Sequence, residues 1–219
     1  MAYILCLETT TTNCSVSIAF KGKTIAIKEL NTQGYSHAES LHVFIDEVLK
    51  SAGISKKELN AIAVSEGPGS YTGLRIGVSA AKGFCYALDL PLISIDTLQA
   101  LSMQLNEKEV VYIPMLDARR MEVFTAVFDE NYKKIEETKA LILNENSFIE
   151  YLNKGKVVFL GNANDKLKTL CKHSNATFVD GLLPSAKEMG WLANSKYKKS
   201  DFENVAYFEP FYLKDFVGG

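Results

Sequence analysis

Short apolar and polar segments alternate along the first part of the chain and predict strands separated by turns. Two stretches rich in β-forming residues, Tyr3–Leu7 and Ser15–Phe20, flank a polar segment and predict a β-hairpin. The segment between them, residues 8–13, carries one carboxylate and several hydroxyl groups at the expected hairpin tip. A third strand is expected over Thr24–Leu30, after the turn at residues 21–23.

A helical pattern follows between Ser36 and Gly53. Ser36 and Glu39 have the spacing of a capping box at a helix start. The apolar residues after them recur at intervals of three and four, at Leu41, Phe44, Ile45, Val48, Leu49 and Ala52. This spacing predicts an amphipathic helix that ends at Gly53. A second S-x-x-E spacing, Ser55–Glu58, predicts a shorter helix before a buried strand over Ala61–Ser65.

The segment Ser65–Gly77 contains four glycines and one proline and predicts a tightly constrained junction between a strand and a helix. One interpretation is that the turn binds phosphate at the helix start, although the segment lacks the lysine and the Ser or Thr of a Walker loop. The other is that Gly73, Gly77 and Ala80 form a face of small residues against which a second helix packs, inside the fold or in a partner. We favour the helix-packing interpretation. The helix is expected to run to about Leu88, with another strand at Pro91–Ile95.

The second half of the chain repeats the opening pattern. A strand at Val110–Leu116, a short polar tip and a strand at Glu122–Phe128 again predict a hairpin, and a further strand is expected at Val157–Gly161. We therefore expect two duplicated α/β subdomains, residues 1–104 and residues 105–205. A helix is predicted over Pro184–Asn194, and the aromatic tail, residues 206–219, is expected to pack back onto the first subdomain.

Composition narrows the class of protein. The 219 residues are 47% hydrophobic and 23% charged, which is typical of a globular protein, and the net charge of −2 predicts no general attraction to nucleic acid. The four cysteines have no C-x-x-C spacing and are expected to be reduced thiols in a cytoplasmic protein. His37 and His42 are five residues apart, so they point about 140° apart on a helix. We expect them at a surface or interface, and we predict no metal site.

The repeated hairpin with an acidic tip is similar to the actin, hexokinase and Hsp70-like ATPase fold, which is ribonuclease H-like. A more specific resemblance is to the TsaB (YeaZ-type) family, the paralogues of TsaD (Kae1). Four segments carry it: Leu7-Glu8-Thr9-Thr10, Ser36-His37-Ala38-Glu39-Ser40-Leu41, Gly67-Pro68-Gly69-Ser70-Tyr71-Thr72-Gly73-Leu74-Arg75-Ile76-Gly77 and Leu116-Asp117-Ala118-Arg119-Arg120-Met121-Glu122-Val123. The resemblance implies two actin-like subdomains, of which the second is shortened.

In the fold superfamily the two hairpin tips face a nucleotide. The resemblance therefore implies candidate nucleotide-binding residues at the tips and after the strand near residue 160: Glu8, Thr9, Thr10, Asp117 and Gly161. These side chains could equally satisfy polar turns within the fold. Arg119 and Arg120 could neutralise a phosphate or pair with Asp117. We expect no tightly bound cofactor on the isolated chain, with ATP or ADP as candidate ligands of a complex.

The resemblance implies a non-catalytic subunit. TsaD-type subunits hold a metal with two histidines on the helix after the strand at Pro91–Ile95, and those positions are Thr97 and Leu101 in this chain. Neither side chain can replace an imidazole ligand. The implied function is to bind and order TsaD for threonylcarbamoyl transfer to adenosine 37 of tRNAs (t6A biosynthesis). TsaE would join through the complex, tRNA would be contacted only indirectly, and the chain alone would form a homodimer.

The predicted partner surface consists of the helix from Ser36 and the helix from Tyr71. The interface residues are expected to be Ser36, His37, Leu41, Ile45, Gly69, Tyr71, Gly73, Leu74, Arg75, Gly77 and Ala80. The alternative hypothesis is an autonomous enzyme of the same fold, either a small-molecule kinase or ATPase, or an M22-like glycoprotease or metallopeptidase.

Overall fold

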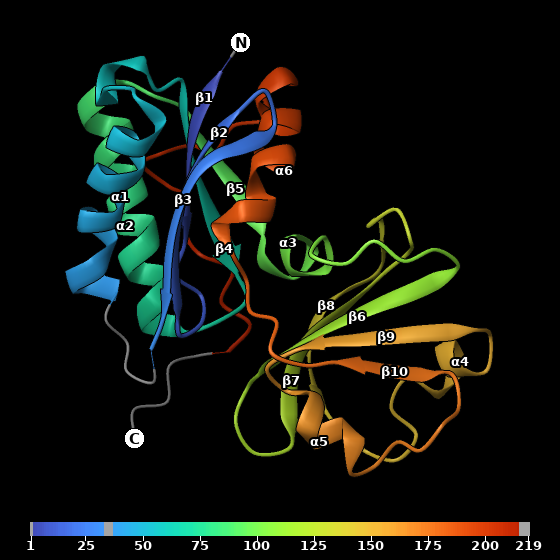
Figure 1. Ribbon diagram of the computed structural model, residues 1–219. Coiled ribbons are helices and arrows are strands. Elements are labelled where there is room, and N and C mark those ends of the chain that lie inside the picture. The colour runs from blue at the N-terminus through green and yellow to red at the C-terminus, as the bar shows by residue number, and fades with distance from the viewer. Residues whose placement is uncertain (1, 33–36, 215–219) are drawn as a thin grey trace. The chain divides into compact units, whose positions relative to one another are not determined.

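The computed structural model describes residues 2–32 and 37–214, which form two compact α/β units (Figure 1). The first unit comprises Met1–Ala100 and Pro184–Tyr212, and the second is built on Leu101–Leu183. Ser36, the first residue of the predicted capping box, and the end of the predicted tail lie outside the described residues. Along the described part of the chain, no helix has both the length and the apolar character needed to cross a bilayer.

The first unit is built on a five-stranded sheet. Its strands, in the spatial order β3-β2-β1-β4-β5, are β3 (Lys23–Asn31), β2 (Asn13–Phe20), β1 (Tyr3–Glu8), β4 (Ala61–Gly67) and β5 (Leu92–Asp96). The predicted hairpin is confirmed, because β1 and β2 pair antiparallel from Tyr3 with Phe20 to Glu8 with Ser15. β4 and β5 pair parallel, and β4 lies beside β1.

Helices cover both faces of this sheet. The helices α1 (His37–Ala52) and α2 (Tyr71–Leu88) lie on one face and α6 (Ala186–Lys198) lies on the other (Figure 1). A short 3-10 turn, η1 (Lys56–Glu58), begins with the predicted capping box at Ser55. The apolar stripe of α1 is buried against the sheet as its spacing predicted, with Leu41, Phe44, Ile45, Val48 and Leu49 in the main core. Three of the four cysteines, Cys6, Cys14 and Cys85, are buried thiols, and none is in a disulfide.

The second unit has the same topology. Its strands, in the order β10-β9-β6-β7-β8, are β10 (Ala176–Val179), β9 (Lys156–Gly161), β6 (Val110–Asp117), β7 (Glu122–Phe128) and β8 (Lys134–Ile142). β6, β7 and β8 pair antiparallel, whereas β9 and β10 continue the sheet in parallel from β6. Its helices are the short α4 (Ile149–Leu152) and α5 (Asn164–Lys168), and α3 (Thr97–Ser102) follows β5. The duplication and the predicted fold class are confirmed.

The predicted boundary of the second subdomain requires a correction. Residues 105–205 were assigned to it, but the segment Pro184–Tyr212 belongs to the first unit. Hydrogen bonds fix the start of α6 to β2: the Ser15 hydroxyl accepts from the Ala186 amide at 3.0 Å, and the Ser17 hydroxyl donates to the Ala186 carbonyl at 2.7 Å. Two buried serines in a strand were the sequence signal for this contact, since buried hydroxyl groups require partners.

The turn between β1 and β2 packs directly against the start of α2. The Thr9 hydroxyl donates to the Gly73 carbonyl at 2.7 Å, and the Ser70 amide donates to the Thr10 carbonyl at 2.7 Å. A Cβ atom on Gly73 would overlap the Thr9 carbonyl oxygen, and one on Gly77 would overlap the Thr9 hydroxyl. The absence of side chains at these two glycines therefore allows the turn to approach the helix.

Glu8 lies beneath this turn and is fully buried. Its Oε1 accepts hydrogen bonds from the Thr10 amide at 2.6 Å and the Thr10 hydroxyl at 2.5 Å, and its Oε2 accepts from the Ser65 hydroxyl. Burial raises the pKa of Glu8, and the hydrogen bonds from Ser65 and Thr10 oppose that shift without cancelling it. Glu8 thus ties the hairpin tip to β4 from inside the unit.

We predict that Gly73→Ala destabilises the fold by about 3 kcal/mol or more, because the added methyl group meets backbone that cannot move away. The matched control is Gly83→Ala on the same helix, where nothing lies within 4 Å of the added Cβ. The control should be more stable than the unaltered chain by about 0.5–1 kcal/mol, through helix propensity. Urea unfolding of the three proteins measures both effects, and equal stability of the two variants would contradict the packing described.

We predict that replacing Glu8 removes one component of the pH dependence of stability. A raised folded-state pKa favours the folded state at low pH, and this contribution is lost as the pH rises from the ordinary value of 4.5 through the folded-state pKa of Glu8. Glu8→Gln has no ionisable group there, so the unaltered chain should lose stability relative to the variant, by up to about 1.4 kcal/mol per pH unit within that window. The measurement is urea unfolding of both proteins from pH 4.5 to pH 8. If the difference in the free energy of unfolding between the two proteins stays constant with pH, the pKa of Glu8 is not raised by folding.

Candidate functional site

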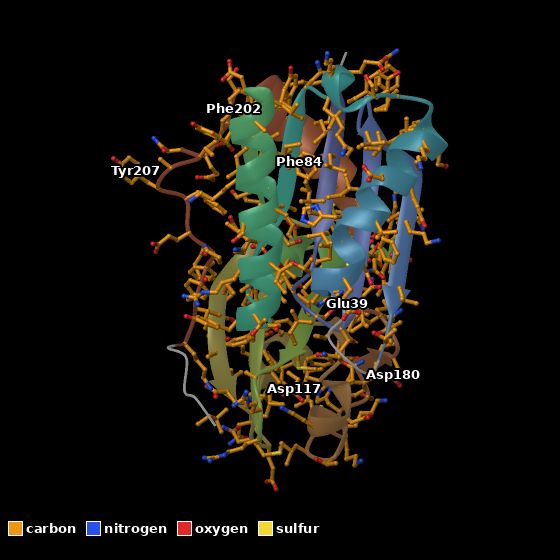
Figure 2. The ribbon with its side chains drawn as sticks, turned by 90° about the vertical axis from the view of Figure 1, so that its left-hand side faces the viewer. Glu39, Phe84, Asp117, Asp180, Phe202 and Tyr207 are labelled. Atoms are coloured by element: carbon orange, nitrogen blue, oxygen red, sulfur yellow. The ribbon has the colours of Figure 1, made fainter. Side chains whose placement is uncertain are left out.

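A groove lies between α1 and α2 on the outer face of the first unit. Figure 2 looks onto this face, with the two helices side by side and Phe84 between them. The groove has a volume of about 650 Å³ and is mostly apolar. Its lining residues come from both helices: His37, Ala38, Leu41, His42, Arg75, Ile76, Ser79, Ala80, Gly83, Phe84 and Ala87. The surface can therefore receive an apolar segment, such as a helix of another protein.

The small residues of α2 form one strip along the helix, which has two kinds of contact. Gly73 and Gly77 face inwards and contact the β1–β2 turn, whereas Ala80, Gly83 and Ala87 line the groove. The sequence predicted a face of small residues with Gly73, Gly77 and Ala80 but not Gly83 and Ala87. Their spacing was the available signal, because residues three, four and seven apart share a side of a helix.

The structure places the predicted interface residues in two environments. Arg75 is exposed, Gly69, Tyr71 and Ala80 are half-buried, and Ser36 lies outside the described residues. The others are in the interior of the unit: His37, Leu41, Ile45, Gly73, Leu74 and Gly77. His37 and Leu41 still contribute to the groove lining. Helical spacing identifies an apolar face of a helix, but it does not show whether the sheet or a partner covers that face. Four of the predicted interface residues are therefore reassigned to the core: Ile45, Gly73, Leu74 and Gly77.

His37 fixes the start of α1 from inside the fold. Its ring Nε2 lies 2.7 Å from the Thr11 carbonyl oxygen, an acceptor, so Nε2 carries the proton. Burial lowers the pKa of His37, although the hydrogen bond to Thr11 opposes this. The neutral His37 side chain donates to the backbone of the β1–β2 turn and also lines the groove, so it links the two.

Arg75 lies at the rim of the groove and is held by two tyrosines. Its guanidinium carbon is 4.3 Å from the centroid of the Tyr71 ring. It also donates a hydrogen bond to the Tyr212 side chain, which raises the pKa of Arg75. The centroids of the Tyr71 and Tyr212 rings are 5.0 Å apart and the rings are tilted by 42°, so the three side chains form one cluster. The sequence predicted that the tail containing Tyr212 packs back onto the first subdomain, and residues up to Tyr212 do so, but it did not predict the contact of Tyr212 with Arg75.

The candidate nucleotide-binding residues of the first hairpin tip, Glu8, Thr9 and Thr10, form hydrogen bonds within the first unit. The Glu8 carboxylate accepts hydrogen bonds on both oxygens, and the Thr9 and Thr10 hydroxyls donate to Gly73 and Glu8. All three residues are buried. Their part in nucleotide binding stays a prediction, and their structural role is to hold the turn against α2.

The second tip brings Asp117 and the Gly161 loop together. The Asp117 amide donates to the Asn162 side chain at 2.8 Å, and its Oδ1 is 3.0 Å from the Lys166 ammonium group. Of the two roles considered for Arg119 and Arg120, pairing with Asp117 is not what the structure shows, because the cation beside this carboxylate is Lys166. Arg119 contributes its backbone amide at 2.6 Å. Gly161 has φ of +110°, and a Cβ there would overlap the Met115 carbonyl oxygen. Glycine is thus required for the close approach of β9 to β6.

Thr97 and Leu101, at which the resemblance to TsaD-type subunits implies metal-binding histidines, have structural contacts in this chain. The Thr97 hydroxyl accepts a hydrogen bond from the Gly67 amide at 3.1 Å, and Leu101 is fully buried. Among the residues that the structure describes, no three His, Cys, Asp or Glu side chains are grouped so as to hold a metal ion.

Known proteins resemble the chain over nearly its whole length. A family model described as TsaD, tRNA N6-adenosine threonylcarbamoyltransferase, matches residues 31–217. The tRNA threonylcarbamoyladenosine biosynthesis protein TsaB of Escherichia coli is 30% identical over 223 residues, which cover 98% of this chain and 95% of that protein. TsaB of Haemophilus influenzae is 29% identical over 226 residues, covering 98% and 94%.

Solved structures confirm the fold. YeaZ from Pseudomonas aeruginosa superposes with a TM-score of 0.83 at 22% identity, covering 97% of this chain and 100% of that chain. A second Pseudomonas aeruginosa structure, described as similar to the peptidase YeaZ, gives a TM-score of 0.86 at 22% identity over 98% of this chain and 100% of that one. The TsaB relatives and the family model show that the chain belongs to the TsaB family, within the wider group that the TsaD family model describes.

Proposed function

We propose that this chain acts in the biosynthesis of threonylcarbamoyladenosine in tRNA as a non-catalytic subunit that binds TsaD. The TsaB relatives are named for that pathway. The observation that carries the finer proposal is the apolar groove between α1 and α2. By holding TsaD through this groove, the chain would order it for threonylcarbamoyl transfer to adenosine 37, and TsaE would join through the assembled complex.

The shape of the groove supports a helical protein partner. Its lining includes the large apolar residues Leu41 and Phe84, and the small residues Ala80, Gly83 and Ala87 leave room above α2. An open apolar groove of this kind gains free energy when a partner covers it, because apolar surface leaves water. The net charge of −2 favours a protein partner over direct binding of tRNA.

The relation to TsaD supports a paired arrangement. A tRNA N6-adenosine threonylcarbamoyltransferase of Streptococcus sanguinis is 39% identical over 80 residues, which are 36% of this chain and 24% of that protein. Related chains can present equivalent helix faces to each other, as the two halves of an isologous dimer do. We propose that the same face forms a homodimer of this chain when TsaD is absent.

Two substituted positions support a non-catalytic role. Thr97 and Leu101 stand where the resemblance implies histidines, and both side chains are used in packing or backbone hydrogen bonding. Neither can ligate a metal as an imidazole does. The transfer chemistry would therefore belong to TsaD.

The engagement of the tip residues supports a further part of the proposal, that the isolated chain binds no nucleotide tightly. Glu8 accepts hydrogen bonds on both carboxylate oxygens, and Asp117 is paired with Lys166. ATP or ADP would bind in the assembled complex.

The direct test mixes the chain with TsaD from the same organism. Light scattering should give the mass of a defined complex, and threonylcarbamoyl transfer to tRNA by TsaD should depend on the chain. If no complex forms and the chain alone hydrolyses a nucleotide or a peptide, the autonomous-enzyme hypothesis replaces the proposal.

We predict that Gly83→Glu weakens TsaD binding at least thirtyfold, which is about 2 kcal/mol, because it places an unpaired charge in an apolar interface. The fold should be retained, since nothing lies within 4 Å of the added Cβ and glutamate favours a helix more than glycine does. Calorimetric titration with TsaD measures the change.

The matched control is Val43→Glu, which adds the same charge at an exposed apolar position of α1 that does not line the groove. Its affinity for TsaD should stay within about twofold of the unaltered chain. If both variants bind TsaD as the unaltered chain does, the groove is not the contact surface.

We predict that titration of ATP or ADP into the isolated chain gives no binding tighter than about 100 μM, about 5.5 kcal/mol. The same titration into the mixture with TsaD should give a defined binding isotherm. Tight binding by the isolated chain that is lost in Asp117→Asn would overturn this part of the proposal.

A further inference from the structure

The C-terminal segment of the first unit, residues 203–212, crosses from β5 to the start of α2, and we name it the strap. The Glu203 amide donates to the Leu92 carbonyl at 2.9 Å, which fixes one end of the strap to β5. In its middle, the Lys82 ammonium group of α2 donates to the Ala206 and Phe208 carbonyls, each at 3.1 Å. The strap is therefore attached to both the sheet and the helix that forms the groove.

The far end of the strap is fixed close to Arg75. The Phe211 amide donates to the Glu66 carbonyl at 2.7 Å, and this bond places the next residue, Tyr212, beside the first turn of α2. The Tyr212 ring lies 5.0 Å from the Tyr71 ring and its side chain hydrogen-bonds Arg75. Residues more than a hundred positions apart thus meet at the rim of the groove.

Arg75 is suited to pair with a carboxylate of a partner. Among the described residues that line the groove, it is the one Lys or Arg, and the rest of the lining is mostly apolar. An arginine that is already oriented loses less side-chain entropy when it forms a bidentate pair than a mobile arginine does. The contact with the Tyr71 ring and the hydrogen bond to Tyr212 supply that orientation.

We propose that Tyr212 is a positioning residue of the partner-binding surface, and that it holds Arg75 at the groove rim for a carboxylate of the bound protein. This inference rests on the proposed function, because the bound protein is TsaD. It assigns the strap a part in recognition, in addition to covering the edge of β5.

The test compares the affinity for TsaD of the unaltered chain, Tyr212→Phe, Arg75→Gln and the double variant. Tyr212→Phe keeps the ring and removes only the hydroxyl group, so binding should weaken about two- to tenfold. In the Arg75→Gln background, the same change should have no further effect, because the group that Tyr212 positions is gone. The matched control is Tyr207→Phe in the same strap, where the tyrosine is 83% exposed and projects away from the unit (Figure 2).

Each outcome has a definite consequence. If Tyr212→Phe binds as tightly as the unaltered chain, or weakens binding equally in the Arg75→Gln background, Tyr212 does not act through Arg75 and the inference is overturned. A fall in the thermal unfolding midpoint of Tyr212→Phe that accounts for its weaker binding would also overturn it, as a structural effect. If the unaltered chain does not bind TsaD, the proposed function fails and the inference fails with it.

Discussion

The close approach of the β1–β2 turn to α2 determines the arrangement of the first unit. Thr9 contacts the helix backbone at Gly73 and Gly77, and a methyl group at either glycine would prevent this contact. The approach fixes which side of α2 faces the sheet. The adjacent side, with Ala80 and Gly83, then remains to form the groove with α1. One backbone contact inside the fold thus sets the orientation of the surface outside it.

Polar groups of the turn are also hydrogen-bonded to the neighbouring elements of the unit. Glu8 receives hydrogen bonds from Thr10 and Ser65, and His37 donates to Thr11 at the start of α1. Buried hydrogen bonds of this kind favour one arrangement of the elements that they join. The acidic, Thr-rich tip therefore joins β1, β4, α1 and α2. We attribute to it the fixed positions of α1 and α2, the two helices that form the groove.

Much of the fold could be predicted from local pattern. The structure confirms three features that are local in sequence: the apolar spacing of α1, the hairpin whose first strand ends at Glu8, and the repeat that begins near Val110. Long-range contacts could not be predicted in this way. The return of α6 to the first unit depends on Ser15 and Ser17, and the cluster at Arg75 depends on Tyr212, more than a hundred residues away.

The candidate surface was predicted only in part for the same reason. Periodicity placed Leu41, Ile45 and Leu74 on helix faces, but it could not show that the sheet of the same chain buries Ile45 and Leu74. Burial depends on which elements pack together, which spacing alone does not encode. Arg75 and Ala80 were predicted and lie at the groove, whereas Gly83 and Phe84 are visible there only in the structure.

Hydrogen exchange with and without TsaD would test the central claim most directly, since it reports which backbone segments a partner covers. If the groove binds TsaD, exchange should slow in peptides from α1, α2 and the strap, and peptides from β9 and α5 should be unchanged. Protection confined to the second unit, or unchanged exchange in α1 and α2 at saturating TsaD, would contradict the account.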